Sequence, residues 1–255
     1  AGEAAVSGVS LVDQIMVLLI NIFAALATGG AVVAGQYLGQ KNKEQACKST
    51  TQLMWSMGFI SLVITAFVYA CKYWILHGVF GQIEADVMHH ADVYLLIVTA
   101  SIPFIALYNG GAAVFRAMGN SEVSMKVSLL MNAINVSGNA ILIYGFHCGT
   151  EGVAIPTLVS RFVAAFIIIK LLLKDKWSLH LERTYRFNPD WSMIRKILSV
   201  GIPNGLENSM FQLGKLAIQS TVSTLGTTAI AAQAMTNILE NLNGMAAIGV
   251  GVGLM

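Results

Sequence analysis

Residues 6–37 read VSGVSLVDQIMVLLINIFAALATGGAVVAGQY, a run in which Asp13 is the only charged side chain. About 20 predominantly apolar residues in helical form suffice to cross the hydrocarbon core of a bilayer. Six comparable blocks follow, at about 53–76, 93–115, 123–146, 153–173, 197–225 and 228–255. The chain is 56% hydrophobic and 11% charged, against about 25% charged in typical soluble domains. We therefore predict an all-α membrane protein, a polytopic bundle with about seven transmembrane helices.

Two stretches of the chain, 2–15 and 226–239, echo each other. Gly2 falls on Gly226, Ala5 on Ala229 and Asp13 on Asn237. Six of the predicted spans separate the two stretches, so both begin on the same side of the membrane and indicate parallel repeats about an axis along the membrane normal.

The predicted division is an N-terminal lobe at 1–173 lacking its first helix, a cytoplasmic linker at 174–196, and the start of a C-terminal lobe at 197–255. Nothing ahead of Gly2 corresponds to the span that precedes Gly226. We therefore expect the first span and most of the second lobe to lie outside this sequence.

Basic residues fix the predicted orientation, because Lys and Arg are retained in cytoplasmic loops. Twelve of the fifteen lie in or beside the alternate segments 38–52, 114–126 and 174–196. These segments are predicted to face the cytoplasm. In the last of them, Trp177 and Trp191 are expected at headgroup depth, and Asn188 is expected to cap a short helix with Pro189 at its first position.

Small residues and prolines predict how the helices pack and bend. Gly35 and Gly39 form a GxxxG pair, with Gly29 and Gly30 just before it, and small residues let helix backbones approach closely in a bilayer. Pro103 is predicted to kink a helix from within. Pro156 and Pro203 are expected to occupy early helical turns.

Several motifs resemble the multidrug and toxic compound extrusion (MATE) family of cation-coupled efflux transporters. They are the opening stretch 2–15, AGQYLG at 34–39, FRAMGNS at 115–121, GVAIPT at 152–157 and GIP at 201–203. The resemblance covers nearly the whole chain. It implies twelve helices in two six-helix lobes around a central cleft, of which this chain would hold helices two to eight.

Ionisable side chains inside a membrane are costly and mark functional sites. Asp13, Arg161, Glu207, Lys215 and Glu240 qualify. Lys215 lies eleven residues before Gly226 and Glu240 fourteen after it, so the two reach similar depth in antiparallel neighbours. We predict that Lys215 and Glu240 pair, either as a fixed ion pair or as a pair that a proton or sodium ion breaks.

Glu207 follows Pro203 by four residues. Some branches of the family place an essential Glu eight residues after the Gly-x-Pro, and here that position is Phe211. Glu207 therefore either serves a similar role one turn earlier or lines the inner mouth. Asp13, near the outer end of its helix, is expected to extend its carboxylate toward water.

Amide side chains complete the predicted substrate or ion site. Asn132, Asn135 and Asn139 share one helix stripe, and Gln212, Asn237 and Asn241 lie near the proposed Lys215–Glu240 pair. Such amides either link helices to one another or line a cavity for amphipathic cations.

Other polar clusters predict no additional site. Cys47, Cys71 and Cys148 lack zinc-site spacing, and a disulfide between Cys71 and Cys148 stays open. Glu84, Asp86, His89, His90 and Asp92 are clustered, but adjacent His residues point to different helix faces, so no metal site is predicted.

The leading functional hypothesis is a secondary active exporter in the plasma membrane. An amphipathic, often cationic drug or metabolite leaves while a proton or sodium ion enters. The alternative is a flippase for a lipid-linked saccharide. The sequence contains no nucleotide-binding GxxxxGK[ST] and no HExxH, so neither ATP hydrolysis nor an enzymatic activity is predicted. The predicted partners are small-molecule substrates and membrane lipid, without nucleic acid or cofactor, and the full-length protein is expected to be monomeric.

Overall fold

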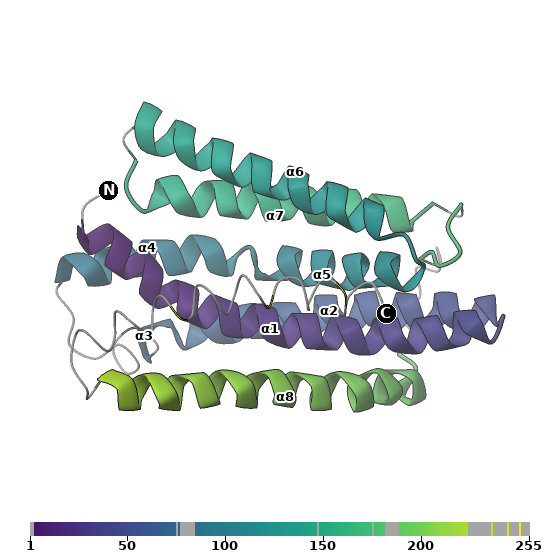
Figure 1. Cartoon of the computed structure of the whole chain (residues 1–255). Helices are drawn as coiled ribbons and strands as arrows, with labels where there is room; N and C mark the ends of the chain where they lie inside the picture. Colours follow the sequence, from purple (N-terminus) through teal and green to yellow (C-terminus); the bar gives the residue numbers. More distant parts are fainter. Residues whose placement is uncertain are drawn as a thin grey trace.

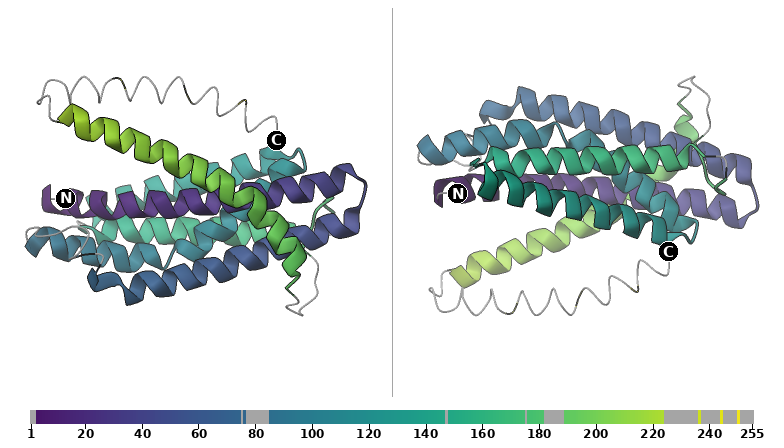
Figure 2. Two further views of the ribbon diagram at one scale, coloured as in Figure 1. Left: turned by 90° about the horizontal axis from the view of Figure 1, so that it is seen from below. Right: turned by 90° about the horizontal axis from the view of Figure 1, so that it is seen from above.

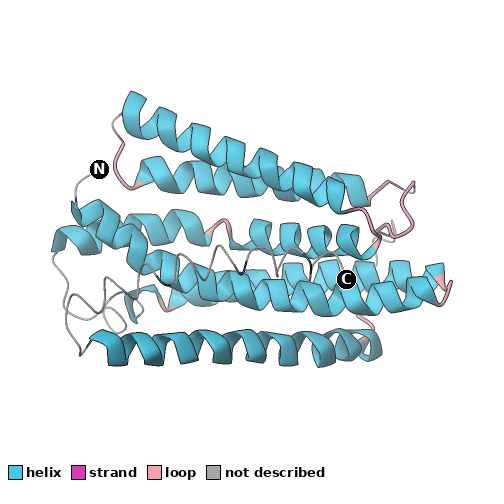
Figure 3. Cartoon of the chain, in the orientation of Figure 1, coloured by secondary structure: helices cyan, strands magenta, loops and turns pink. Residues whose placement is uncertain are grey.

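The computed structural model describes residues 3–74, 76, 85–146, 148–174, 176–181 and 189–223, and the isolated positions 236, 244 and 250. Within that part of the chain every regular element is a helix (Figure 3). The elements are α1 (Glu3–Gly39), α2 (Lys43–Ala70), α3 (Lys72–Trp74), α4 (Ala85–Thr99), α5 (Ile102–Ala117), α6 (Ser121–Ala140), the π-turn η2 (Ile141–Gly145), α7 (Glu151–Leu172) and α8 (Trp191–Ser223). The predicted all-α bundle is confirmed.

Four helical segments of the described chain are long and apolar enough to cross a membrane singly: Ile15–Gly39, Lys43–Ala70, Ser121–Gly145 and Glu151–Leu172. The bent pair Met88–Thr99 and Ile102–Ala117 makes a fifth. These five account for the first five predicted blocks. Helix α8 contains the sixth block but is less apolar, because residues 204–212 carry three amides and Glu207. The seventh block lies outside the described residues, apart from three isolated positions.

Helix α1 is the central element of the bundle. It packs against α2, α4, α5 and α8, while α6 and α7 pack together on the opposite side from α8 (Figure 1). Seen from below, α8 crosses α1 obliquely (Figure 2). The core holds fully buried large side chains from three elements, including Phe23, Leu53 and Phe115.

Two short turns join helices at the end predicted to face the cytoplasm, and both are built the same way. In each, one residue takes a positive φ just after the helix: Lys41 at 60° and Gly119 at 74°. The next amide, Asn42 or Asn120, donates back to a carbonyl five residues earlier, at 3.0 and 2.9 Å. This closes the helix end by the Schellman pattern. The FRAMGNS motif at 115–121 thus contains one of these two tight turns.

A bend lies near Pro103, as predicted, but Pro103 does not kink one helix from within: the chain breaks between α4 and α5. The axes of Met88–Thr99 and Ile102–Ala117 meet at 47°, and Pro103 occupies the first turn of α5. Since proline cannot donate the backbone hydrogen bond of a continuing helix, the chain breaks just before it. Ser101, at the break, donates through Oγ to the carbonyl of Val98 at 2.6 Å.

Helix α8 begins earlier than expected and differently capped. It starts at Trp191, where the carboxylate of Asp190 accepts from the amides of Ser192 (3.1 Å) and Met193 (3.3 Å). Asn188 itself lies outside the described residues. The separate short helix that was predicted after it is absent from residues 189–223, where one continuous helix begins at Trp191. Pro203 then sits in the interior of α8 instead of an early turn, and Pro156 lies inside α7.

Trp177 in the predicted linker is half-buried, with its ring edge-on to fully buried Phe115 at 5.4 Å between centroids. Its depth in the membrane stays a prediction. Nearby Leu179 is fully buried as well. This part of the predicted linker packs onto the bundle because its apolar side chains gain more from burial there than from the interface. Trp191 is 75% exposed, as an interfacial residue would be.

The GxxxG pair is not where the helices approach most closely. A Cβ at Gly39 would meet nothing within 4 Å, and one at Gly35 would touch only Ala117 at 3.9 Å. A Cβ at Gly29, by contrast, would lie 2.6 Å from the backbone nitrogen of Gly201. The tight contact predicted for small residues therefore exists, but it is Gly29 against α8.

Candidate functional site

A polar network crosses the middle of the bundle. The hydroxyl of Tyr94 on α4 donates to Oδ1 of Asp13 on α1 at 2.8 Å. Arg161 on α7 donates from Nη1 to Oγ of Ser101 at 2.8 Å. Arg161 is also within electrostatic reach of the Asp13 carboxylate. Three helices and the α4–α5 break thus each contribute one polar group.

A second cluster joins α6 to α7. Asn135 donates from Nδ2 to Oγ1 of Thr157 at 3.0 Å, and Asn139 donates from Nδ2 to Oδ1 of Asn135 at 3.2 Å. The Thr157 hydroxyl in turn donates to the carbonyl of Val153 at 2.8 Å. Oδ1 of Asn139 is buried without a hydrogen-bond partner in the described chain. A buried acceptor left unpaired costs free energy, so a ligand that donates to it would be favoured.

The two clusters are linked through α7. Thr157 and Arg161 are four residues apart and so lie one turn apart on the same side of the helix. We call the seven residues of the two clusters the N-lobe seam: Asp13, Tyr94, Ser101, Asn135, Asn139, Thr157 and Arg161. It places a guanidinium, a carboxylate, amides and hydroxyls within a bundle whose buried side chains are mainly apolar.

The guanidinium of Arg161 gives the seam its chemical character. Arg161 lies ten residues from the start of α7, midway along a 22-residue helix. A guanidinium has five N–H donors, and within the described chain one of them has a hydrogen-bond partner. Arginine at this depth is expensive and marks a functional site by default.

Some of the predicted site residues come together in the structure, some do not, and some lie outside the described residues. Asp13, Asn135 and Asn139 belong to the N-lobe seam. Asn132 is exposed on α6 and makes no seam contact. Glu207 and Phe211 are exposed on one side of α8. The side chains of Gln212 and Lys215, and the whole of Asn237, Glu240 and Asn241, lie outside the described residues, so the Lys215–Glu240 pair stays a prediction.

Asp13 was expected to extend toward water, and its side chain is exposed. One of its oxygens also accepts from the hydroxyl of Tyr94, which is 3% exposed. The partners Tyr94, Ser101 and Thr157 were missed from the sequence. The spacing of Thr157 and Arg161 was an available signal, since two polar residues four apart in an apolar helix predict a shared polar face.

The acidic and histidine cluster near the start of α4 makes contacts within the protein. Nζ of Lys72 lies 2.6 Å from Oδ1 of Asp92. Nδ1 of His90 lies 2.6 Å from Oγ1 of Thr150, before α7. Among the described residues, no three His, Cys, Asp or Glu side chains converge as metal ligands would. The three cysteines Cys47, Cys71 and Cys148 are free thiols.

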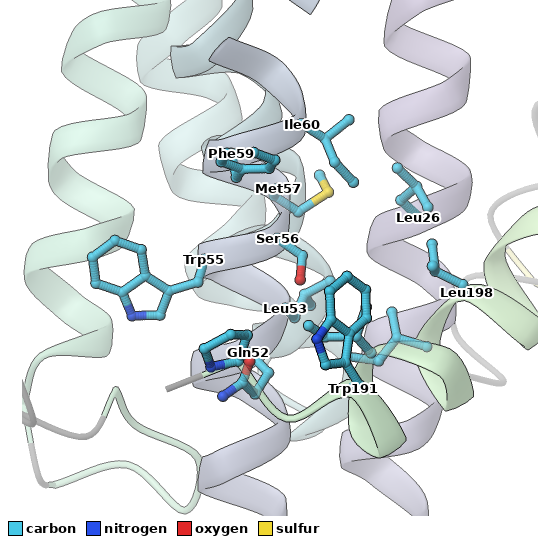
Figure 4. Close-up of a pocket in the computed structure, with 13 residues that line it drawn as sticks. Leu26, Gln52, Leu53, Trp55, Ser56, Met57, Phe59, Ile60, Trp191 and Leu198 are labelled. Atoms are coloured by element: carbon cyan, nitrogen blue, oxygen red, sulfur yellow. The ribbon is translucent and has the colours of Figure 1, made fainter. Parts of the chain in front are cut away.

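An apolar groove lies between α2 and α8, separate from the N-lobe seam. Its volume is about 410 Å³. Figure 4 shows the lining side chains, which come mainly from α2 and α8, with Leu26 of α1 next to Leu198. We call it the α2–α8 groove. The residues that line it are Leu26, Gln52, Leu53, Trp55, Ser56, Met57, Phe59, Ile60, Pro189, Trp191, Ile194, Ile197 and Leu198.

Comparison with known proteins gives the family. The family model MatE matches residues 1–141. An uncharacterized transporter, YisQ of Bacillus subtilis, is 28% identical over 240 residues, which are 92% of this chain and 52% of YisQ. The probable multidrug resistance protein NorM of Thermotoga maritima is 26% identical over 98% of this chain and 54% of its own length.

Solved structures agree on the fold. A transporter of the MOP superfamily from Pyrococcus furiosus superposes with a TM-score of 0.90 at 20% identity, over 99% of this chain and 56% of its own. A structure of MATE in a bent conformation gives 0.91 at 20% identity. These neighbours have the two-lobe 6+6 fold. The chain spans about half the length of the relatives it matches. It is a multi-pass protein of the plasma membrane, and it belongs to the MatE family, the non-enzymatic MATE transporters.

Proposed function

We propose that this protein is the drug-efflux transporter that its family membership suggests. In this proposal it is a secondary active exporter: an amphipathic drug or metabolite leaves the cell while a proton or sodium ion enters. In this proposal the inward movement of the ion supplies the free energy for export, and no cofactor takes part.

The observation that carries the proposal is the N-lobe seam. A half-buried guanidinium, a carboxylate and an unpaired amide oxygen each cost free energy in an apolar surrounding. A membrane bundle that only held its helices together would gain no stability from them. A transporter needs such groups to contact a polar or charged ligand in the middle of the membrane. The residues of the N-lobe seam lie on different helices, which supports the proposal further. Relative movement of α1, α4 and α7 would change the contacts between them.

Relatives named for drug export favour this function over its alternative. NorM of Thermotoga maritima is called a probable multidrug resistance protein, and MepA of Staphylococcus aureus, 24% identical over 89% of this chain, a multidrug export protein. A flippase for lipid-linked saccharides would need several cations for the pyrophosphate, and the seam contains one, Arg161.

The test is uptake by vesicles containing the full-length protein. A fluorescent amphipathic dye such as ethidium is supplied outside, and pH and sodium gradients are imposed separately. We expect dye accumulation that requires one of the two gradients and stops when an ionophore collapses it. Dye movement that is independent of both gradients, or turnover of lipid-linked saccharide without either, would contradict the proposal.

A further inference from the structure

The α2–α8 groove begins at the end of the helices predicted to face the cytoplasm and reaches just past the midpoint of α2. Helix α2 begins at Lys43, and Gln52 and Ile60 follow nine and seventeen residues later. At 1.5 Å per residue these positions are about 14 and 26 Å from the helix start. On α8 the lining runs from Trp191, the first residue of the helix, to Leu198. The groove therefore runs from the predicted inner interface into the hydrocarbon region.

The interior of the groove is apolar. Of the lining residues, only Gln52 and Ser56 carry a polar group other than an indole N–H. Phe59 is 63% exposed, so this wall stays uncovered by the described chain. An unfilled apolar gap would forfeit dispersion contacts along both walls.

The mouth of the groove is cationic and aromatic. Trp191 is 75% exposed at the first turn of α8, and Figure 4 shows its indole at the end of the groove near Gln52 and Leu53. Arg195 follows four residues later on the same side of α8, and it is exposed. Lys48, one turn before Gln52, lies 2.7 Å from Asp190 through its ammonium. Arg195 and Lys48 do not themselves line the groove, but Arg195 follows a lining residue by one turn on α8 and Lys48 precedes one by one turn on α2, with Asp190 as the one carboxylate beside them.

These features suit one kind of ligand. Tryptophan gathers at membrane interfaces, and basic residues beside the inner leaflet attract anionic lipid headgroups. We propose that the α2–α8 groove binds an anionic phospholipid of the inner leaflet, with an acyl chain along the apolar walls and its phosphate at Arg195. The occupant bridges α2 and α8. This site is separate from the N-lobe seam and from drug transport.

Native mass spectrometry of the full-length protein tests the site. Protein is released from nanodiscs that contain phosphatidylglycerol and phosphatidylcholine, and the lipids retained per protein are counted. We expect preferential retention of phosphatidylglycerol. Arg195→Gln should weaken it about fivefold, the factor for roughly 1 kcal/mol per basic residue at an anionic surface. Lys126→Gln is the matched control, since Lys126 is an exposed cation near the predicted inner end of α6, away from the groove.

A second pair of variants tests the apolar part. Ser56→Leu adds volume inside the groove and should reduce retention, whereas Ala66→Leu on an exposed position of the same helix should not. Equal retention of both lipids, or equal effects of the groove variants and their controls, would overturn the proposal.

Photo-crosslinking identifies the occupant in the membrane. In the variant Phe59→p-benzoylphenylalanine, irradiation should form a covalent adduct between the photoreactive side chain on α2 and a phospholipid. If the adduct instead joins α2 to another part of the full-length protein or to a second copy, the groove is a protein interface and the lipid site is wrong. Neither this readout nor lipid retention requires transport activity, so the result stands whether or not drug export is found.

Discussion

Arg161 is the residue on which the charge balance of the N-lobe seam depends. Its guanidinium donates to Ser101 and lies within electrostatic reach of the Asp13 carboxylate. Removing one member of a charge network in an apolar bundle leaves the remaining charge without compensation. Arg161 and Asp13 are therefore energetically coupled, and the effect of changing both will differ from the sum of the separate effects.

Arg161→Gln in the full-length protein should lower the free energy of unfolding by about 1–3 kcal/mol, the range for a lost hydrogen bond that leaves a group unsatisfied. Thermal unfolding in detergent gives the measurement. Adding Asp13→Asn should recover part of the loss, because it removes the uncompensated carboxylate. Strictly additive losses in this double-mutant cycle would show that the two charges are not coupled.

Asn139 carries the one amide oxygen of the N-lobe seam that has no partner. Asn139→Ala should reduce the rate of gradient-driven dye export by roughly tenfold at limiting dye, because a hydrogen bond to ligand worth about 1–2 kcal/mol would be lost. Asn132→Ala removes an exposed amide two turns earlier on α6 and should leave export nearly unchanged. Equal losses in the two variants would place the ligand contact elsewhere.

At the scale of the elements, the crossing of α1 and α8 depends on backbone approach. Gly29 faces Gly201 of α8 so closely that a Cβ would lie 2.8 Å or less from three backbone atoms: the nitrogen and Cα of Gly201 and the carbonyl oxygen of Ile197. Backbone atoms cannot move aside as a flexible side chain can. A larger residue at this position must therefore separate the two helices.

Gly29→Ala should destabilise the full-length protein by about 1–3 kcal/mol, the range for overpacking. Gly39→Ala is the control, because a Cβ there meets nothing. The two variants are compared by thermal unfolding. Since alanine also favours helix over glycine, Gly39→Ala should be neutral or slightly stabilising, and a loss equal to that of Gly29→Ala would show that the α1–α8 contact is not the cause.

At the scale of the whole molecule, Asp190 in the predicted linker contacts both α8 and α2. Its carboxylate caps α8 and pairs with Lys48 on α2 at 2.7 Å. The hydrogen bond from Lys48, with those from the amides of Met193 and Ser192, holds the pKa of Asp190 below its ordinary value. A depressed carboxyl pKa stabilises the fold above the unfolded-state value, about 3.9. That stabilisation is lost as the pH falls through the lower folded-state pKa.

Asp190→Asn keeps the helix cap, since asparagine caps as well as aspartate, but removes the ion pair. At pH 7 the variant should unfold roughly 2 °C below the native protein, as befits a partly exposed pair. The difference should shrink as the pH falls below about 3.9 and through the lower folded-state pKa of Asp190. Asp190→Ala, which loses the cap as well, should unfold lower still at pH 7. A pH-independent difference for Asp190→Asn would contradict the ion-pair contribution.

The long apolar blocks made the bundle predictable from the sequence, but not its helix ends. Block 53–76 became a helix beginning at Lys43, because polar residues extend a helix beyond the hydrocarbon. The bend before Pro103 was predictable, since it follows from a missing N–H. The sequence could not show that Gly29, and not the Gly35–Gly39 pair, makes the close helix contact. All three are glycines in one helix, and which of them meets a neighbouring backbone depends on where the partner helix lies.

The sequence by itself determined that the chain crosses the membrane as helices and that ionisable groups lie within them. Both follow from composition and from the 20-residue length that hydrocarbon requires. Only the tertiary structure decided that Asp13 is bonded to Tyr94, that Arg161 reaches Ser101, and that α2 and α8 leave a groove between them. Such contacts join residues far apart in the chain, and their geometry depends on how whole helices cross, which no local pattern records.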